Sequence, residues 1–217
     1  VMLSDVRDRM EHSRPVVLSG CIGPRGDGYI AAAAMTARQA EAYHRAQVET
    51  FAETDADLVS AITMNDSAEA TGIARVARSA GMPVAISFTV ETDGRLPTGQ
   101  PLREAVEEVD ASTDGYPVYY MINCAHPDHM APALDGPWTT RIGGLRANAS
   151  RKSHAELNES TDLDAGDPVE LAALYSRLLE GPLARTNVLG GCCGTDHRHV
   201  ERIAEACVPM LRQESRS

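Results

Sequence analysis

Short apolar runs alternate with longer segments of helical periodicity along the chain. The apolar runs predict six β-strands, over residues 16–21, 58–63, 84–90, 118–124, 142–147 and 187–192. Several of these runs are almost continuous in Val, Ile and Leu, which is typical of strands buried on both faces of a parallel sheet. Strands that alternate with helices in this way indicate βα units.

The segments between the strands carry the signals of helices. Helices are predicted over residues 36–54, 67–80, 101–109, 167–179 and 196–210. Thr36 can cap the first of them, and Asp167 followed by Pro168 suits the start of the fourth. The first ten residues also alternate charged and apolar side chains in the way that a helix does. No low-complexity linker interrupts the pattern, so one domain over residues 1–217 is expected.

Six strands in consecutive order fit either an open doubly wound sheet or part of an eight-stranded barrel. The unusual Gly-, Asn- and Cys-containing segments follow strands and do not precede them, which is where both folds keep their chemistry. No Gly-x-Gly-x-x-Gly motif follows the first strand, which argues against a dinucleotide-binding fold.

Composition narrows the class of protein. A chain of 217 residues, 43% of them hydrophobic, can form one large core. A formal net charge of −11 and the lack of a basic stripe argue against a nucleic-acid partner. No apolar run approaches the length that spans a bilayer, and the first residues lack the apolar block of a signal peptide. A soluble cytoplasmic protein with no membrane partner is therefore expected.

Five cysteines in a chain of this length favour reduced thiols over disulfide staples. Cys192 and Cys193 are adjacent within Gly-Gly-Cys-Cys-Gly. Side chains next to each other in a regular strand face opposite sides, but glycines let the backbone leave that geometry, so both thiols can face one metal ion. The glycine pair alone could equally form a phosphate loop, which the cysteines disfavour. Cys207 is expected to be a small buried hydrophobic residue. Cys21 could be either such a residue or a metal-binding thiol.

A third ligand is expected from another strand end. Cys124 ends the fourth predicted strand, two strands before the cysteine pair, and alternate strands of a barrel contribute side chains to one layer. Three thiolates with one open position are the pattern of a catalytic zinc site. Ligation by His126 or His129 would instead make the site closed and structural. Zn²⁺ is the predicted cofactor.

The thiolate ligands indicate the chemistry. A free thiol has a pKa of about 8.5, and coordination to zinc deprotonates it. Three thiolate donors leave the ion poorly electrophilic, so a fourth, substrate sulfur stays electron-rich. This suits attack by sulfur better than activation of water. The residues alone predict a zinc enzyme that activates a thiol and do not identify the electrophile.

The segment 17–27 (Val-Leu-Ser-Gly-Cys-Ile-Gly-Pro-Arg-Gly-Asp), the pair Asn123-Cys124 and the segment 190–195 (Gly-Gly-Cys-Cys-Gly-Thr) resemble, in this order, the homocysteine S-methyltransferase family. The resemblance implies a (β/α)8 TIM barrel with a zinc ion. The implied zinc ligands are Cys124, Cys192 and Cys193. Homocysteine sulfur would take the fourth position and be methylated to methionine by a sulfonium or betaine-type donor.

One departure from the family concerns length. The family's chains usually have two more βα units at the N-terminus, with an Asp-Gly-Gly element that helps to bind the amino acid. Six of eight strands are visible here, so a barrel lacking its first two βα units is expected. The chain is expected to be a fragment, with a genuinely shortened homologue as the alternative. Such a chain cannot close a barrel and leaves two sheet edges unpaired.

A second departure concerns the substrate. Ile62 stands where many members carry a glutamate that grips the amino group of homocysteine. Either Glu91, after the next strand, supplies a charge, or the thiol is not homocysteine; a solvated loop acid is the other interpretation of Glu91. Asn148 resembles the family's Pro-Asn element and is a candidate substrate contact. Asn123 and Thr63 are further candidates, with a backbone role as the alternative for Asn123.

Two other functions stay open. One is a non-catalytic zinc-binding remnant of the fold, and the other is a redox protein in which Cys192 and Cys193 form a vicinal disulfide. For the enzyme, the expected partners are a small homocysteine-like thiol and a methyl donor, and a homo-oligomer is also considered. The aromatic candidates for holding a cationic donor are Trp138, Tyr119 and Tyr120.

Overall fold

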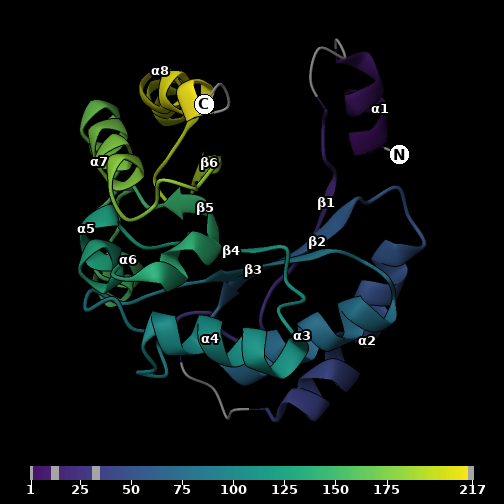
Figure 1. Cartoon of the computed structure of the whole chain (residues 1–217). Coiled ribbons are helices and arrows are strands. Elements are labelled where there is room, and N and C mark those ends of the chain that lie inside the picture. The colour runs from purple at the N-terminus through teal and green to yellow at the C-terminus, as the bar shows by residue number, and fades with distance from the viewer. Residues whose placement is uncertain (1, 11–14, 31–34, 215–217) are drawn as a thin grey trace.

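The computed structural model describes residues 2–10, 15–30 and 35–214 (Figure 1). Its centre is a sheet of six parallel strands that follow one another in sequence order. The strands are β1 (Ser19–Ile22), β2 (Leu58–Met64), β3 (Val84–Phe88), β4 (Tyr119–Asn123), β5 (Ile142–Ala147) and β6 (Val188–Gly191). All six predicted strands are confirmed, with ends that shift by a few residues.

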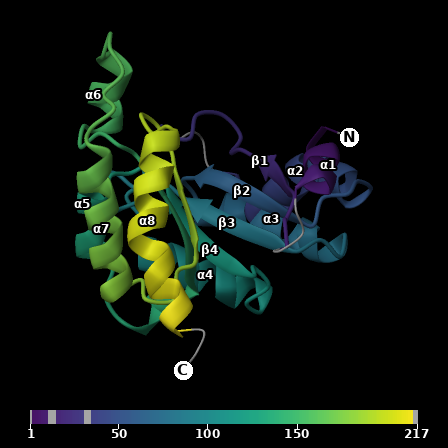
Figure 2. The ribbon, with the colours of Figure 1, turned by 90° about the horizontal axis from the view of Figure 1, so that it is seen from above.

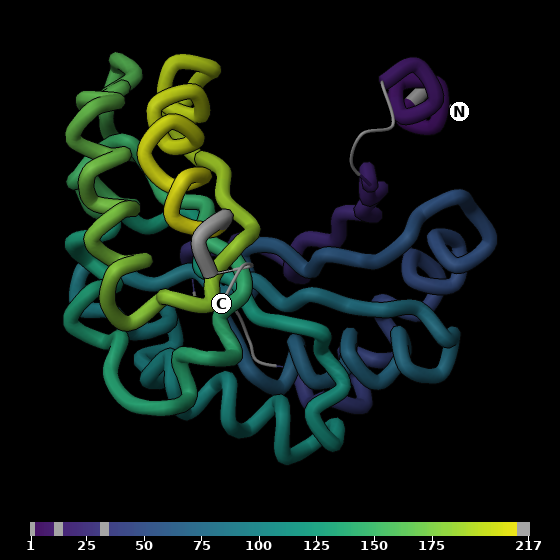
Figure 3. The backbone as a smooth tube through the Cα atoms, turned by 45° about the horizontal axis from the view of Figure 1, so that its top comes forward, coloured from purple at the N-terminus to yellow at the C-terminus, as the bar shows by residue number. Residues whose placement is uncertain are grey.

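The helices that follow the strands cover the outer face of the sheet (Figures 1 and 3). They are α2 (Ala37–Ala52), α3 (Ser67–Ser79), α4 (Leu102–Thr113), α7 (Pro168–Glu180) and α8 (His197–Glu214). Helix α1 (Met2–Arg9) precedes β1, and the short helix α5 (Pro127–Met130) follows β4. The short helix α6 (His154–Glu159) lies at the carboxyl end of the strands, where His154 contacts Cys124. Helices α7 and α8 pack side by side (Figure 2). Short 3-10 turns follow α5, over Ala131–Ala133 and Pro137–Arg141.

Strand order decides between the two predicted architectures. A doubly wound sheet reverses its strand order and carries helices on both faces, whereas a barrel keeps sequence order with the helices outside. The curled, six-stranded parallel sheet is therefore part of a (β/α)8 barrel. Within the described residues β1 pairs only with β2, and β6 only with β5, so each has one unpaired edge.

Local sequence signals set the helix starts. The Thr36 side chain accepts a hydrogen bond from the Gln39 backbone in a capping box, and Asp167 caps α7 directly before Pro168. Both predictions are confirmed. Helices α5 and α6 were not predicted, although Ser153 and Glu156 form a capping box at the start of α6.

The core lies between the sheet and the helices. Tyr120 and Ile122 of β4 face the helices and are fully buried, while Tyr119 and Met121 line the concave face. This alternation follows from the two-residue period of a strand. The concave face encloses an open hollow of about 770 Å³. None of the helices within the described ranges combines the length and the apolar character that crossing a membrane requires.

Candidate metal centre

Three cysteines meet where β4 and β6 end. Cys124 follows β4 directly, and Cys192 and Cys193 follow β6. Their sulfur atoms all lie within 4.8 Å of one another. Because carboxyl ends of parallel strands share one edge of the sheet, residues 68 positions apart in the sequence are brought together here.

The backbone of Cys124 has an unusual conformation. Its φ angle is +54°, a left-handed value that few non-glycine residues adopt. The Cys124 N–H donates to the Arg146 carbonyl oxygen at 3.1 Å, which continues the pairing of β4 with β5. The reversal comes directly after that bond, so the chain leaves the sheet at the ligand itself. Such conformations concentrate at functional sites, where surrounding contacts hold them.

Asn148, after β5, connects the two ligand loops. Its side-chain Nδ2 donates to the Cys124 carbonyl oxygen at 3.0 Å, and its Oδ1 accepts from the Cys193 backbone N–H at 3.1 Å. The residue is 2% exposed. Both ends of the amide are therefore used to fix the ligand backbone. A substrate contact by Asn148 stays a prediction.

The cysteine pair departs from β6 in two steps. Cys192 N–H still donates to the Ala147 carbonyl oxygen at 2.9 Å, as a regular ladder bond, whereas the Cys193 carbonyl accepts from Ala149 at 3.0 Å. Gly194 then turns with a φ of +78°, where an added Cβ would meet the Asp164 backbone. The glycine allows the chain to leave the strand so that both sulfurs face Cys124.

The oxidation state of the sulfurs decides what they can bind. The structure joins the Cys124 and Cys192 sulfurs in a disulfide, with 5.5 Å between the Cα atoms, and Cys193 is free and exposed. A metal ligand must be a thiolate, so the disulfide and the metal-bound centre are alternative states of the same residues. The bond does not join the two adjacent cysteines, so the vicinal disulfide of the redox hypothesis is not observed.

The donor set fits a thiophilic metal ion. Three sulfurs at about 2.3 Å from a tetrahedral zinc ion lie about 3.8 Å apart, which is compatible with sulfurs gathered within 4.8 Å. Among the described residues, no histidine or carboxylate joins this group. His126 Nδ1 instead accepts from the Asp128 N–H, and burial lowers the pKa of His126 to about 4. His129 Nε2 lies 2.9 Å from the Arg151 carbonyl oxygen.

His154 and Glu91 extend the support of Cys124. His154 Nε2 lies 2.5 Å from the Cys124 carbonyl oxygen, and His154 Nδ1 lies 3.1 Å from a Glu91 carboxylate oxygen. Tyr29 packs on the His154 ring with 4.2 Å between ring centroids. Glu91 is one of the residues predicted from the sequence, whereas His154 and Tyr29 were not predicted. The capping box at the start of α6 marked the segment of His154, whereas no sequence signal marked Tyr29.

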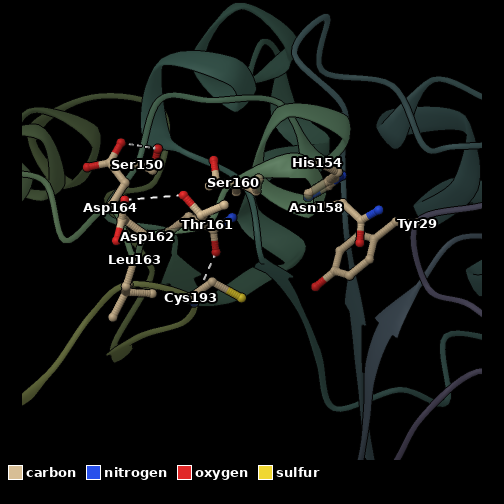
Figure 4. A pocket seen from close by; sticks show the side chains of 13 residues that line it. Tyr29, Ser150, His154, Asn158, Ser160, Thr161, Asp162, Leu163, Asp164 and Cys193 are labelled. Atoms are coloured by element: carbon tan, nitrogen blue, oxygen red, sulfur yellow. Dashed lines mark hydrogen bonds between the residues drawn. The ribbon is translucent and has the colours of Figure 1, made fainter.

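A pocket of about 390 Å³ opens beside Cys193. Figure 4 shows Tyr29 and His154 on one side of it, Asp162 and Asp164 on the other, and Cys193 between them. Burial, followed by the nearby Cys193, raises the pKa of Tyr29 to about 12, so its phenol stays neutral at ordinary pH. The pocket thus presents an aromatic ring and two acids next to a cysteine sulfur.

The predicted contacts Asn123 and Thr63 contact each other. Asn123 Oδ1 accepts from the Thr63 N–H at 3.0 Å and from the Ser87 hydroxyl at 2.5 Å, and Asn123 Nδ2 donates to Thr63 Oγ1 at 2.8 Å. Asn123 is fully buried, and Thr63 has a φ of +62°. The asparagine therefore holds the end of β2 in a strained conformation. Whether either residue contacts substrate stays a prediction, as it does for Glu91.

The remaining candidates divide between the two faces of the sheet. Ile62 and Tyr119 line the concave hollow, as does Cys21. Tyr120 and Trp138 lie in the core on the helix side, away from the cysteine sulfurs, so neither can rest against a donor at that centre. Cys207, expected to be a buried small hydrophobe, is fully buried in the core. Tyr29 is the aromatic residue that lines the pocket beside Cys193.

Comparison with known sequences gives a consistent result. A family model described as Homocysteine S-methyltransferase matches residues 2–207. The homocysteine S-methyltransferase of Escherichia coli (strain K12) is 26% identical over 194 residues, which cover 83% of this chain and 59% of that protein. The chain thus spans less than two thirds of the length of this relative.

Solved structures show the same fold. The metallated form of the homocysteine methyltransferase MmuM from Escherichia coli matches with a TM-score of 0.67 and 20% identity, over 94% of this chain and 65% of that chain. Its apo form matches with a TM-score of 0.64 and 22% identity, over 88% and 63%. The structural likeness extends over the whole curled sheet, and the family model covers almost every residue. The chain belongs to the homocysteine S-methyltransferase family.

Proposed function

We propose that the protein is a zinc-dependent S-methyltransferase that transfers a methyl group from a sulfonium or betaine-type donor to the thiol of homocysteine or a related thiol. The observation that carries the proposal is the gathering of three cysteine sulfurs from two strand ends within 4.8 Å. Family membership supports a thiol as the methyl acceptor. Cys124, Cys192 and Cys193 would hold the zinc ion in their reduced state.

The bond changes of the transfer are simple. Bound zinc would keep the substrate sulfur in its thiolate form at neutral pH, with the thiol proton lost to solvent. The new sulfur–methyl bond forms as the bond between the methyl carbon and the positively charged heteroatom of the donor breaks. The bonding pair stays with that heteroatom, and the donor leaves as a neutral sulfide or amine.

The residues around the cysteines supply position and charge. Asn148 and His154 hold the backbone of the ligand loops through the bonds described above. The pocket beside Cys193 supports the donor assignment, because the Tyr29 ring and the acids Asp162 and Asp164 favour a cation. No general base is required at the thiol.

The proposal is tested with protein reduced and then loaded with zinc. Elemental analysis is expected to find about one zinc per chain, and Cys193→Ser, which removes a ligand with little change in shape, should lose most of it. Cys21→Ser is the matched control and should retain the metal. Methyl transfer from S-methylmethionine to homocysteine is then followed as methionine formed. A wild-type protein that holds no zinc after reduction would refute the proposal.

A catalytically inactive zinc protein is the second candidate. One observation favours it: within the described residues β1 and β6 each keep an unpaired edge, so the sheet does not close around the cysteine centre. Stoichiometric zinc without methionine formation, over several donors and thiols, would support this candidate over the enzyme.

A further inference from the structure

Among the described residues that line the concave hollow, one has a basic side chain. Arg146 of β5 lines this hollow together with Ile62, two serines and several apolar residues of the other strands. The one acid in its lining, Asp196, is bonded to Arg198 and to His199. Arg146 is exposed, and no carboxylate of the described residues forms an ion pair with it.

The strand register places Arg146 next to both ligand loops. It pairs with Asn123 of β4 on one side and with Gly190 of β6 on the other, and Cys124 directly follows Asn123. Its side chain lies across β6, where a Cβ added at Gly190 would be 3.6 Å from Arg146 Cγ. Arg146 Nε donates to the Gly191 carbonyl oxygen at 3.3 Å, one residue before Cys192.

The rest of the guanidinium is available to a ligand. Its Nε bond to Gly191 is the one hydrogen bond that the side chain makes to the described residues, so its two terminal nitrogens remain as donors. A guanidinium binds a carboxylate through two parallel hydrogen bonds, and a strand holds such a group more rigidly than a loop does. The arrangement favours an anionic group in the concave hollow, next to the residues that directly precede Cys124 and Cys192.

Among the described residues that line this hollow, the one carboxylate, Asp196, is already bonded to Arg198 and His199, so no free acid faces an ammonium group. Ile62 contributes an apolar side chain there, and Glu91 does not line it but lies against His154. We propose that Arg146 binds the anionic group of the thiol substrate, so that the protein selects thiol carboxylates by their carboxylate and not by their amino group. This inference rests on the proposed function.

The test uses reduced, Co²⁺-loaded protein, in which ligation of a thiol changes the sulfur-to-cobalt absorption. Three probes are titrated: homocysteine, 4-mercaptobutanoate, which lacks the amino group, and 3-aminopropanethiol, which lacks the carboxylate. Homocysteine and 4-mercaptobutanoate are expected to bind with similar affinity, and about 10- to 100-fold more tightly than 3-aminopropanethiol.

Variants assign that preference to Arg146. Arg146→Met should remove the preference by raising the Kd of both carboxylates about 10- to 100-fold, and Arg146→Lys should retain part of it. Arg38→Met, an exposed arginine on α2, is the control and should change nothing. Thiol binding without a carboxylate preference, or a preference that survives Arg146→Met, would overturn the inference alone. A spectrum that responds to none of the thiols would overturn the proposed function and this inference with it.

Discussion

At the scale of single residues, Asn148 determines how the two ligand loops are spaced. Its amide bonds the carbonyl of Cys124 and the N–H of Cys193, and the residue is buried. Asn148→Ala should lower the free energy of unfolding by about 2–4 kcal/mol, because two buried backbone groups lose their partners. Urea denaturation measures this change. Asn158→Ala, at an exposed position, is the control and should stay within about 0.5 kcal/mol of wild type.

His154 is expected to act on the metal through Cys124. It contacts the Cys124 carbonyl and not a sulfur, so it orients a ligand without being one. Removing such an outer contact typically weakens metal affinity about 10- to 100-fold. His154→Ala should therefore raise the zinc Kd by this order, measured by competition with a chromogenic chelator. An unchanged Kd would show that the His154 contact is not needed to hold the Cys124 loop.

At the scale of elements, α6 presents His154 to the centre. The helix is six residues long, and its start depends on the reciprocal bonds between Ser153 and Glu156. Ser153→Ala should cost about 1 kcal/mol locally and increase amide hydrogen exchange over α6, because a short helix has few other contacts to hold it. Exchange in α3, which has its own Asp66 cap, should not change. Equal exchange in α6 of both proteins would contradict this role of the cap.

The strands could be predicted from the sequence because each is a short apolar run that the sheet buries. The gathering of Cys124, Cys192 and Cys193 could be predicted as well, because cysteines at strand ends share one edge of a parallel sheet. The contacts of Tyr29 and His154 could not, since they depend on how two long loops fold over that edge. Asn123 was predicted as a candidate substrate contact or as a residue with a backbone role. Its bonds to Thr63 and Ser87 could not be predicted, because they depend on the strand register.

At the scale of the whole molecule, the proposed metal binding is expected to depend on the redox state of the cysteines. Zinc uptake should require a reductant, since Cys124 and Cys192 are joined in the structure. Binding to the folded state alone stabilises it by about 2.7 kcal/mol when free zinc is 100 times the Kd. The melting temperature should rise with zinc after reduction and stay unchanged without it. Equal zinc-dependent shifts in both samples would contradict this coupling.

The Asn148 bridge has a consequence for which ions the protein accepts. Because a side-chain amide already fixes the separation of the two ligand backbones, the sulfurs can adapt to an ion mainly by rotating about their own bonds. Ions of a radius near that of zinc are then expected to bind without moving either loop, whereas a markedly larger ion is expected to strain the two bonds of Asn148.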